Sequence, residues 1–322
     1  MYAAAGANAR ACSRRGRSLI LPLRPLAWPA VTIRLGHSHE ADDVFLFHAL
    51  TAGKVDTGDL QIEPVVLDFQ GLNDKASRGE LEATTLSVHA YAYARKHYRL
   101  LRSGWTFGEG RGPMIVAREA MTAETLAAAS IAVGGVTSSA YLAMTLWNPR
   151  ARTRVLPFDK VLPAVETGLV DAGLMVHEEE MALELTGLVC VHDLGEWWSG
   201  KTDGLPLPLG SVVVRRDVDE DVQRQLHKAV SESVHYALAN RQEVVTAVRG
   251  TVGGLEADLA DDFLGRYITD LSLDIGDRGQ SAAEEFLRRG CETGIIPDSL
   301  PLEFAPSAAA EPSSSARDGA RS

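Results

Sequence analysis

Residues 171–180 read DAGLMVHEEE, a short apolar run that ends on a histidine and three glutamates. The run from Ala172 to Val176 has the length and composition of a buried β-strand. At His177 the chain turns from core to water. In an open parallel sheet, ligands bind beyond the carboxyl ends of the strands. The pattern therefore predicts a strand that brings His177 to a ligand-binding edge.

Similar apolar runs alternate with amphipathic stretches along most of the chain. Strands are expected at residues 31–36, 60–67, 82–88, 112–118, 130–135, 153–158, 188–195 and 210–216. Helices are expected at residues 41–53, 69–79, 89–98, 137–148 and 159–168, followed by a helical region at 219–294. Alternating strands and helices indicate βαβ units, so the sequence predicts an α/β fold with mostly parallel sheets.

The length of the chain favours two lobes. At 322 residues it exceeds the size at which a single core stops growing, roughly 250–300 residues. The two blocks of units predict two α/β lobes with a ligand cleft between them, joined by crossing strands near 112–118 and 206–216. We assign residues 31–116 and 212–304 to lobe 1 and residues 117–211 to lobe 2.

Residues 1–30 and 305–322 are expected to be a disordered leader and tail, because neither can contribute to a core. The leader contains an arginine pair, as an export signal would. Its apolar run, Leu19 to Leu23, has only five residues, against the roughly 7–15 of a signal, and Arg24 follows it. We therefore expect a cytoplasmic protein. No apolar stretch reaches about 18 residues, so no membrane span is predicted.

The charge and the cysteines of the chain argue against several classes of partner and site. The net charge is −11, although residues 1–30 contain arginines and no acid. So acidic a body argues against binding to nucleic acid or to anionic membranes. Cys12, Cys190 and Cys291 are far apart and odd in number, which suggests neither a disulfide framework nor a zinc site.

Two motifs suggest cofactors but lack the context that a cofactor site needs. His37, His39 and Glu40 are residue types that bind zinc or iron, yet a strand-to-helix turn capped by Ser38 explains them without a metal. The glycine-rich stretch 104–113 precedes a strand rather than a helix, so it is not a dinucleotide-binding loop. The chain has neither a P-loop nor a nucleophile elbow. No metal or cofactor is predicted.

A second strand end carries hydroxyl groups. The stretch VGGVTSSAY, residues 133–141, runs from a strand through two glycines to a helix that opens on Thr137, Ser138 and Ser139. Free N–H groups at such a helix start bind carboxylates and other anions. For His177, a helix dipole favours the neutral form and the three glutamates favour the cation. These residues alone leave open whether His177 is a general base or a core histidine.

Several ordered blocks between Thr32 and Phe304 resemble the 1,4-dihydroxy-6-naphthoate synthases of the futalosine route to menaquinone. They are residues 35–68, TTLSVHAYAY at 84–93, GEGRGPMIVARE at 108–119, AGLMVHEEE at 172–180, DLGEWW at 193–198 and GLPLPLGSVVVRRD at 204–217. The resemblance implies a two-lobed fold like that of periplasmic solute-binding proteins, which closes over its ligand.

The resemblance also implies a reaction. The enzyme would be a lyase that converts cyclic dehypoxanthinylfutalosine to 1,4-dihydroxy-6-naphthoate and dihydroxyacetone, driven by aromatisation and without a metal or redox cofactor. The family's histidine base matches His177. Its substrate-binding positions, together with the helix start described above, are Thr85, Leu86, Ser87, Ser138, Ser139 and Ala140.

The chain departs from the family pattern at two places. In one loop, His39 and Ala41 replace two prolines. At the helix start described above, residues 134–135 are Gly-Gly where the family has Pro-Gly, and Ser138 and Ser139 replace two threonines but keep their hydroxyl groups. Loss of both proline rings should leave the loop around His39 and Ala41 less constrained.

Two other functions fit the same fold. One is a non-catalytic solute-binding protein, and the other is chorismate dehydratase of the same pathway.

Overall fold

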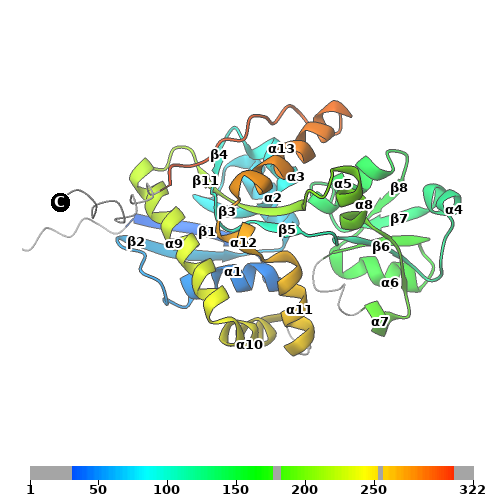
Figure 1. Ribbon diagram of the computed structural model, residues 1–322, viewed down its shortest axis with the longest axis horizontal. Coiled ribbons are helices and arrows are strands. Elements are labelled where there is room, and N and C mark those ends of the chain that lie inside the picture. Colours follow the sequence, from blue (N-terminus) through cyan, green and yellow to red (C-terminus); the bar gives the residue numbers. More distant parts are fainter. Residues whose placement is uncertain (1–30, 177–182, 253–256, 308–322) are drawn as a thin grey trace, which may run out of the picture.

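The computed structural model describes residues 31–176, 183–252 and 257–307, which form two sheets side by side, each flanked by helices (Figure 1). The first sheet has the order β2-β1-β3-β11-β4, and β5 also pairs with β11. Its strands are β1 Val31–His37, β2 Leu60–Val66, β3 Ala83–Ser87, β4 Tyr98–Leu100, β5 Thr106–Gly108 and β11 Leu207–Arg215.

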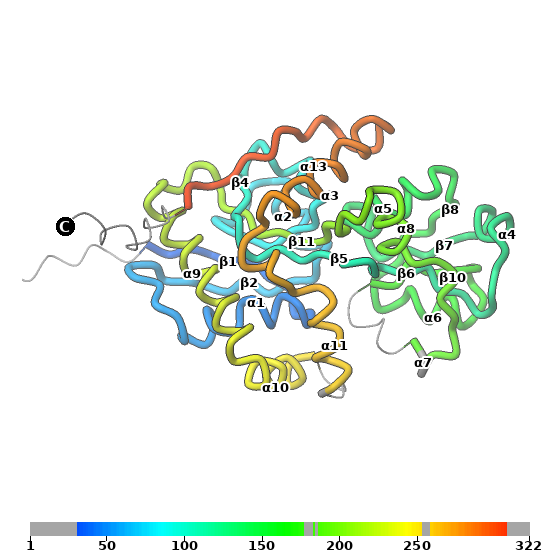
Figure 2. The backbone as a smooth tube through the Cα atoms, viewed as in Figure 1, coloured from blue at the N-terminus to red at the C-terminus, as the bar shows by residue number. Residues whose placement is uncertain are grey.

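The second sheet has the order β10-β6-β9-β7-β8. Its strands are β6 Met114–Ala117, β7 Ser130–Val133, β8 Arg152–Val155, β9 Ala172–Met175 and β10 Val189–Asp193. The chain passes from the first sheet to the second between β5 and β6, and it returns through β11. The two α/β lobes predicted from the sequence are therefore present, with their sheets at opposite ends of the molecule in Figure 2.

The sheets are mixed, whereas the sequence predicts mostly parallel ones. Strand β1 is parallel to β2 and β3, and β7 is parallel to β8 and β9. Strand β11 is antiparallel to β3, β4 and β5, and β6 is antiparallel to β9 and β10. The strands that bring the chain into each lobe from the other enter against the direction of their neighbours. Apolar runs give no strand direction, so the sequence could not show this.

Helices cover both faces of the first sheet. In Figure 1, α1 Ala41–Thr51, α9 Glu220–Ala239, α10 Arg241–Val252 and α11 Ala257–Tyr267 lie on one side. Their apolar faces form one buried cluster with β1 and β11, including Phe45, Phe47 and Leu226. The opposite side carries α2 Phe69–Arg78, α3 Val88–Ala94 and α13 Gly276–Glu292, and the short α12 Asp270–Leu273 follows α11.

The second sheet is flanked by α4 Ala123–Ala128, α5 Ser139–Trp147, the 3₁₀ helix η1 Phe158–Lys160, α6 Val161–Glu166, α7 Leu183–Thr186 and α8 Leu194–Lys201. A second buried cluster crosses the junction, since it includes Leu86 of β3, Ile115 of β6, Leu142 of α5 and Phe286 of α13. The lobes are thus packed against each other through apolar side chains. Burial of that surface fixes where the strand ends of the two lobes meet.

Most of the longer elements lie where the sequence predicts them. Helix α2 begins at its cap Asp68, whose carboxylate accepts the Gly71 N–H, and ends at Gly79. The sequence gives no signal for β4 and β5, because strands of three residues are too short to show a period. The boundaries predicted at 116–117 and 211–212 fall inside β6 and β11, and the division of the lobes there stays a prediction. No helix in the described ranges has the length and apolar character needed to cross a membrane.

Candidate active site

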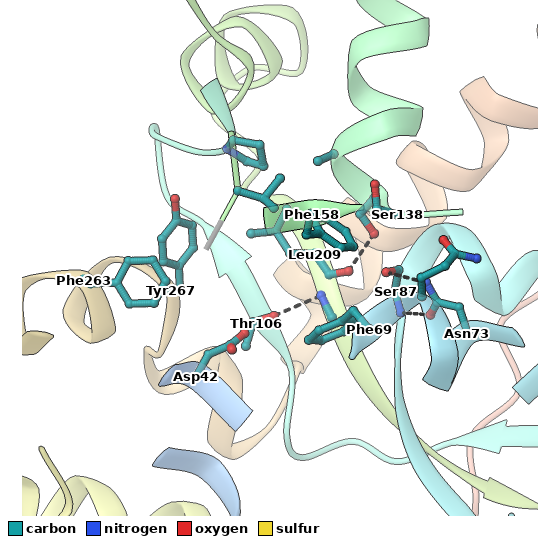
Figure 3. Close-up of a pocket in the computed structure, with 16 residues that line it drawn as sticks. Asp42, Phe69, Asn73, Ser87, Thr106, Ser138, Phe158, Leu209, Phe263 and Tyr267 are labelled. Atoms are coloured by element: carbon teal, nitrogen blue, oxygen red, sulfur yellow. Dashed lines mark hydrogen bonds between the residues drawn. The ribbon is translucent and has the colours of Figure 1, made fainter. Parts of the chain in front are cut away.

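A cavity lies where the two lobes meet (Figure 3). One part of its wall comes from helices of the first lobe, namely Asp42, Phe69, Gln70, Asn73, Phe263 and Tyr267. Another comes from strands of that lobe, namely Ser87, Thr106, Leu209 and Gly210. The second lobe and its entry segment contribute Pro113, Ser138, Ser139, Ala140, Phe158 and Val176.

Val176 connects this cavity to the histidine singled out by the sequence. It follows β9 directly, it is 6% exposed, and its side chain lines the cavity. The predicted strand is therefore present, and the residue after it lies at the cavity. His177 is the next residue and lies outside the described residues, so its role as a base stays a prediction.

Ser87 presents a hydroxyl group to the cavity, and Asn73 holds it there. The Asn73 amide nitrogen donates to Ser87 Oγ at 3.2 Å, and the Ser87 N–H donates to Asn73 Oδ1 at 3.0 Å. Ser87 Oγ acts as an acceptor in this pair. Its hydroxyl hydrogen has no acceptor among the described residues, so it can be donated to a ligand.

Helix α5 begins at the same cavity, as the sequence predicts, but its hydroxyl groups have other partners. Ser138 is the N-cap, accepting the Tyr141 N–H at 3.1 Å and donating to the Gly135 carbonyl. Ser139 Oγ donates to the Leu209 carbonyl at 2.6 Å. Thr137 donates to Gln70 Oε1 at 3.2 Å. These hydroxyl hydrogens are already used, two of them to join α5 and its preceding loop to the first lobe.

The backbone at the start of α5 remains available. No hydrogen bond within the described part of the chain uses the N–H groups of Ser139 or Ala140. Both residues line the cavity, and the N-terminus of the nine-residue helix carries a partial positive charge. The described cavity wall contains no lysine or arginine. A carboxylate bound here would therefore be held by these N–H groups and by the Ser87 hydroxyl rather than by a salt bridge.

Thr85 and Leu86 do not line the cavity, although both belong to the predicted site. The Thr85 hydroxyl donates to Asp43 Oδ2 at 2.9 Å, and Leu86 is fully buried in the cluster that crosses the junction. Thus β3 contributes its last residue, Ser87, to the cavity wall. The two residues before it anchor the strand.

Two aromatic rings form part of the apolar wall. Phe69 begins α2 and Phe158 begins η1, and both lie in the middle of Figure 3 near Leu209. Gly134 makes the position of Phe158 possible, because a Cβ atom at residue 134 would lie only 2.1 Å from a ring carbon. One of the two glycines before α5 is therefore required by packing at the cavity wall. Aromatic faces of this kind suit a flat ring as ligand.

His89 is the buried histidine of the described site region. Its ring nitrogen Nδ1 lies 3.0 Å from the Ser138 carbonyl, and its backbone N–H donates to Ser139 Oγ at 3.3 Å. Burial lowers the pKa of His89 to about 4, partly opposed by the bond to Ser138. The ring is thus neutral at pH 7, with Nδ1 as the donor, and it fastens α3 to the start of α5.

The chain is similar to known proteins over most of its length. A family model described as menaquinone biosynthesis matches residues 33–292. A 1,4-dihydroxy-6-naphthoate synthase of Thermus thermophilus is 38% identical over 271 residues, which are 84% of this chain and 98% of that protein. A relative of the same name from Streptomyces coelicolor is 32% identical over 274 residues, covering 83% of this chain and 96% of the relative. The chain belongs to the menaquinone biosynthesis family.

Solved structures agree with the family fold. A crystal structure of a protein from Archaeoglobus fulgidus has a TM-score of 0.79 and 37% identity, covering 82% of this chain and 98% of that one. An alkanesulfonate-binding protein of Xanthomonas axonopodis has a TM-score of 0.63 at 16% identity, covering 85% of this chain and 96% of that one. The fold is therefore that of the periplasmic binding proteins, as the resemblance implies.

The loop that departs from the family pattern is held by hydrogen bonds. The Ser38 N–H donates to Asp43 Oδ2 at 2.6 Å, and Ser38 Oγ accepts the Glu40 N–H at 3.1 Å. We expected Ser38 to cap α1, and this expectation is wrong. The cap position is Glu40, which makes no side-chain capping bond. Among the residues with described positions, no group of three His, Cys, Asp or Glu side chains is placed to hold a metal ion.

The DLGEWW block, residues 193–198, has a structural role. Asp193 caps α8 by accepting the N–H groups of Gly195 and Glu196. Trp198 is fully buried, and its indole N–H donates to the Pro206 carbonyl at 3.1 Å. This block fixes the return of the chain into β11, whose residues Leu209 and Gly210 then line the cavity.

Proposed function

We propose that the protein is a carbon–carbon lyase of the cytoplasm that converts cyclic dehypoxanthinylfutalosine to 1,4-dihydroxy-6-naphthoate and dihydroxyacetone. The observation that carries this proposal is the cavity between the lobes. Aromatic side chains form part of its wall, it has free N–H groups and no cation in its described wall, and it is lined by the residue before His177. The matches to two relatives named 1,4-dihydroxy-6-naphthoate synthase cover nearly the whole length of each relative.

The described residues suit the parts of that substrate. The carboxylate would bind the N–H groups of Ser139 and Ala140 with the Ser87 hydroxyl beside them. Phe69 and Phe158 would contact the ring that becomes aromatic. Closure of such a cavity excludes water, which strengthens the hydrogen bonds to the carboxylate.

His177 is the proposed general base. A base must accept a proton near neutral pH, and histidine has an unshifted pKa in that range. Removal of the proton starts a fragmentation whose driving force is aromatisation, so proton transfer is the chemistry that the protein must supply. Neither a metal nor a redox cofactor is required by this route.

The test is to incubate the purified protein with cyclic dehypoxanthinylfutalosine and to follow the dihydroxynaphthoate chromophore. Positioned base catalysis contributes roughly 10²–10⁴ in rate, so His177→Asn should lower turnover by about that factor while the substrate still binds. Turnover of the wild type should also fall at acid pH, as the imidazole becomes protonated. Binding without conversion by the wild type would instead indicate a solute-binding protein. Conversion of chorismate would indicate the dehydratase.

A further inference from the structure

The cavity has a second polar end that the proposed carboxylate site does not use. In Figure 3, Ser87, Asn73 and Ser138 lie on one side of Phe69 and Leu209, whereas Asp42 and Thr106 lie on the other. Asp42 comes from α1 and is 7% exposed, and Thr106 comes from β5 and is 4% exposed. Two buried polar side chains from separate elements thus face a cavity whose middle is apolar.

Thr106 is held so that it can donate a hydrogen bond into the cavity. Its Oγ1 accepts the Gly210 N–H at 2.9 Å, which occupies one acceptor site of the hydroxyl. The hydroxyl hydrogen has no acceptor among the residues that the structure describes. One further lone pair also remains, since a hydroxyl oxygen can accept twice.

A bulge in β11 creates this arrangement. Pairing between β5 and β11 shifts between Pro208 and Gly210, so that Leu209 has no partner on β5. The Leu209 carbonyl accepts from Ser139, and the next N–H, from Gly210, donates to Thr106. A Cβ atom at residue 210 would lie 2.8 Å from Thr106 Oγ1, so glycine is needed for this approach. Successive residues of the bulge thus contact Ser139 at one polar end of the cavity and Thr106 at the other.

Charge determines what each end can bind. A ligand carboxylate at Asp42 would be repelled by like charge, whereas ligand hydroxyl groups would find a strong acceptor there. Thr106 can both donate to a hydroxyl group and accept from one. The opposite end offers neutral N–H donors at the start of α5, which suit a carboxylate.

We propose that Asp42 and Thr106 form a subsite for the hydroxyl groups of the substrate, on the side of the molecule that leaves as dihydroxyacetone. The subsite rests on the proposed function. It orients the substrate, with its carboxylate at α5 and its polyol portion at Asp42 and Thr106. The subsite distinguishes the substrate from the released naphthoate, which has a carboxylate but no polyol.

The experiment compares two ligands in three variants. Thr106→Val removes the hydroxyl at nearly constant volume, Thr106→Ser retains it, and Asp42→Asn removes the charge. The Michaelis constant is measured with cyclic dehypoxanthinylfutalosine, and the dissociation constant is measured with 1,4-dihydroxy-6-naphthoate. Loss of one neutral hydrogen bond should raise the Michaelis constant of Thr106→Val by about threefold to tenfold. Thr106→Ser should stay within about twofold of the wild type by the same measure.

The naphthoate provides the control for folding. Its affinity should be unchanged in Thr106→Val, and unchanged or higher in Asp42→Asn, because it lacks the polyol and carries a negative charge. Equal losses for both ligands would overturn the subsite and give Thr106 a purely structural role. An unchanged Michaelis constant in both Thr106→Val and Asp42→Asn would overturn it as well. A wild type that neither binds nor converts the substrate would overturn the proposed function, and the subsite with it.

Discussion

Replacement of Ser139 by alanine tests whether its hydroxyl group joins the lobes or binds the substrate. Ser139 is 3% exposed, and its Oγ donates to the Leu209 carbonyl and accepts the His89 N–H. Alanine would leave both backbone groups without this partner in a buried position. An unsatisfied buried polar group costs roughly 1–3 kcal/mol, so the free energy of unfolding should fall by about that amount.

Ser211 provides a matched control on the same strand, β11. It is also buried, but its hydroxyl group has no hydrogen-bond partner among the described residues. Ser211→Ala should therefore leave the free energy of unfolding unchanged or slightly higher, since replacing an unpaired buried hydroxyl removes a desolvation cost. Both variants replace serine by alanine and remove one hydroxyl group. They differ in whether that hydroxyl group has hydrogen-bond partners.

Both variants should be unfolded in urea and followed by tryptophan fluorescence, with substrate affinity measured in parallel. Ser139→Ala should show a lower midpoint at constant slope, and Ser211→Ala should overlay the wild type. One result would refute the reasoning. If Ser139→Ala unfolded like the wild type but bound substrate ten or more times more weakly, its hydroxyl would serve the ligand and not the junction.

Two further variants test other parts of the structure. Because burial lowers the pKa of His89 to about 4, protons bind the unfolded chain first as the pH falls below 6.5, and stability declines between those values. Between pH 7 and pH 5 this histidine should lower the free energy of unfolding by about 2 kcal/mol. His89→Asn, which keeps a donor, should lose that part of the pH dependence when it is unfolded in urea. Equal pH dependence in the wild type and the variant would show that His89 is not responsible. Ala41→Pro should raise the free energy of unfolding by about 0.4–1 kcal/mol, because residue 41 begins α1 and the preceding Glu40 has the extended φ of −75° and ψ of 158° that a proline accepts. A lowered urea midpoint would show that the ring does not fit at this buried position.

The sequence alone determined where most of the longer elements lie. Strand β9, the start of α5 and the end of α2 at Gly79 lie where apolar periods and capping residues predict them. Each of these signals lies within a window of a few residues, so it can be recognised from the sequence alone. The family and the two-lobed fold were also predicted, because the matching blocks are spread over most of the chain.

Only the tertiary structure decided which polar groups face the ligand. The bond from Ser139 to Leu209 joins residues 70 positions apart, and the bond between Gly210 and Thr106 spans 104 positions. The sequence shows that Ser139 has a hydroxyl group, but it does not show where the hydrogen of that group is donated. Strand direction and the role of Asp42 and Thr106 were missed for the same reason. They depend on how distant strand ends meet once the apolar surfaces between the lobes are buried, and no local pattern encodes that meeting.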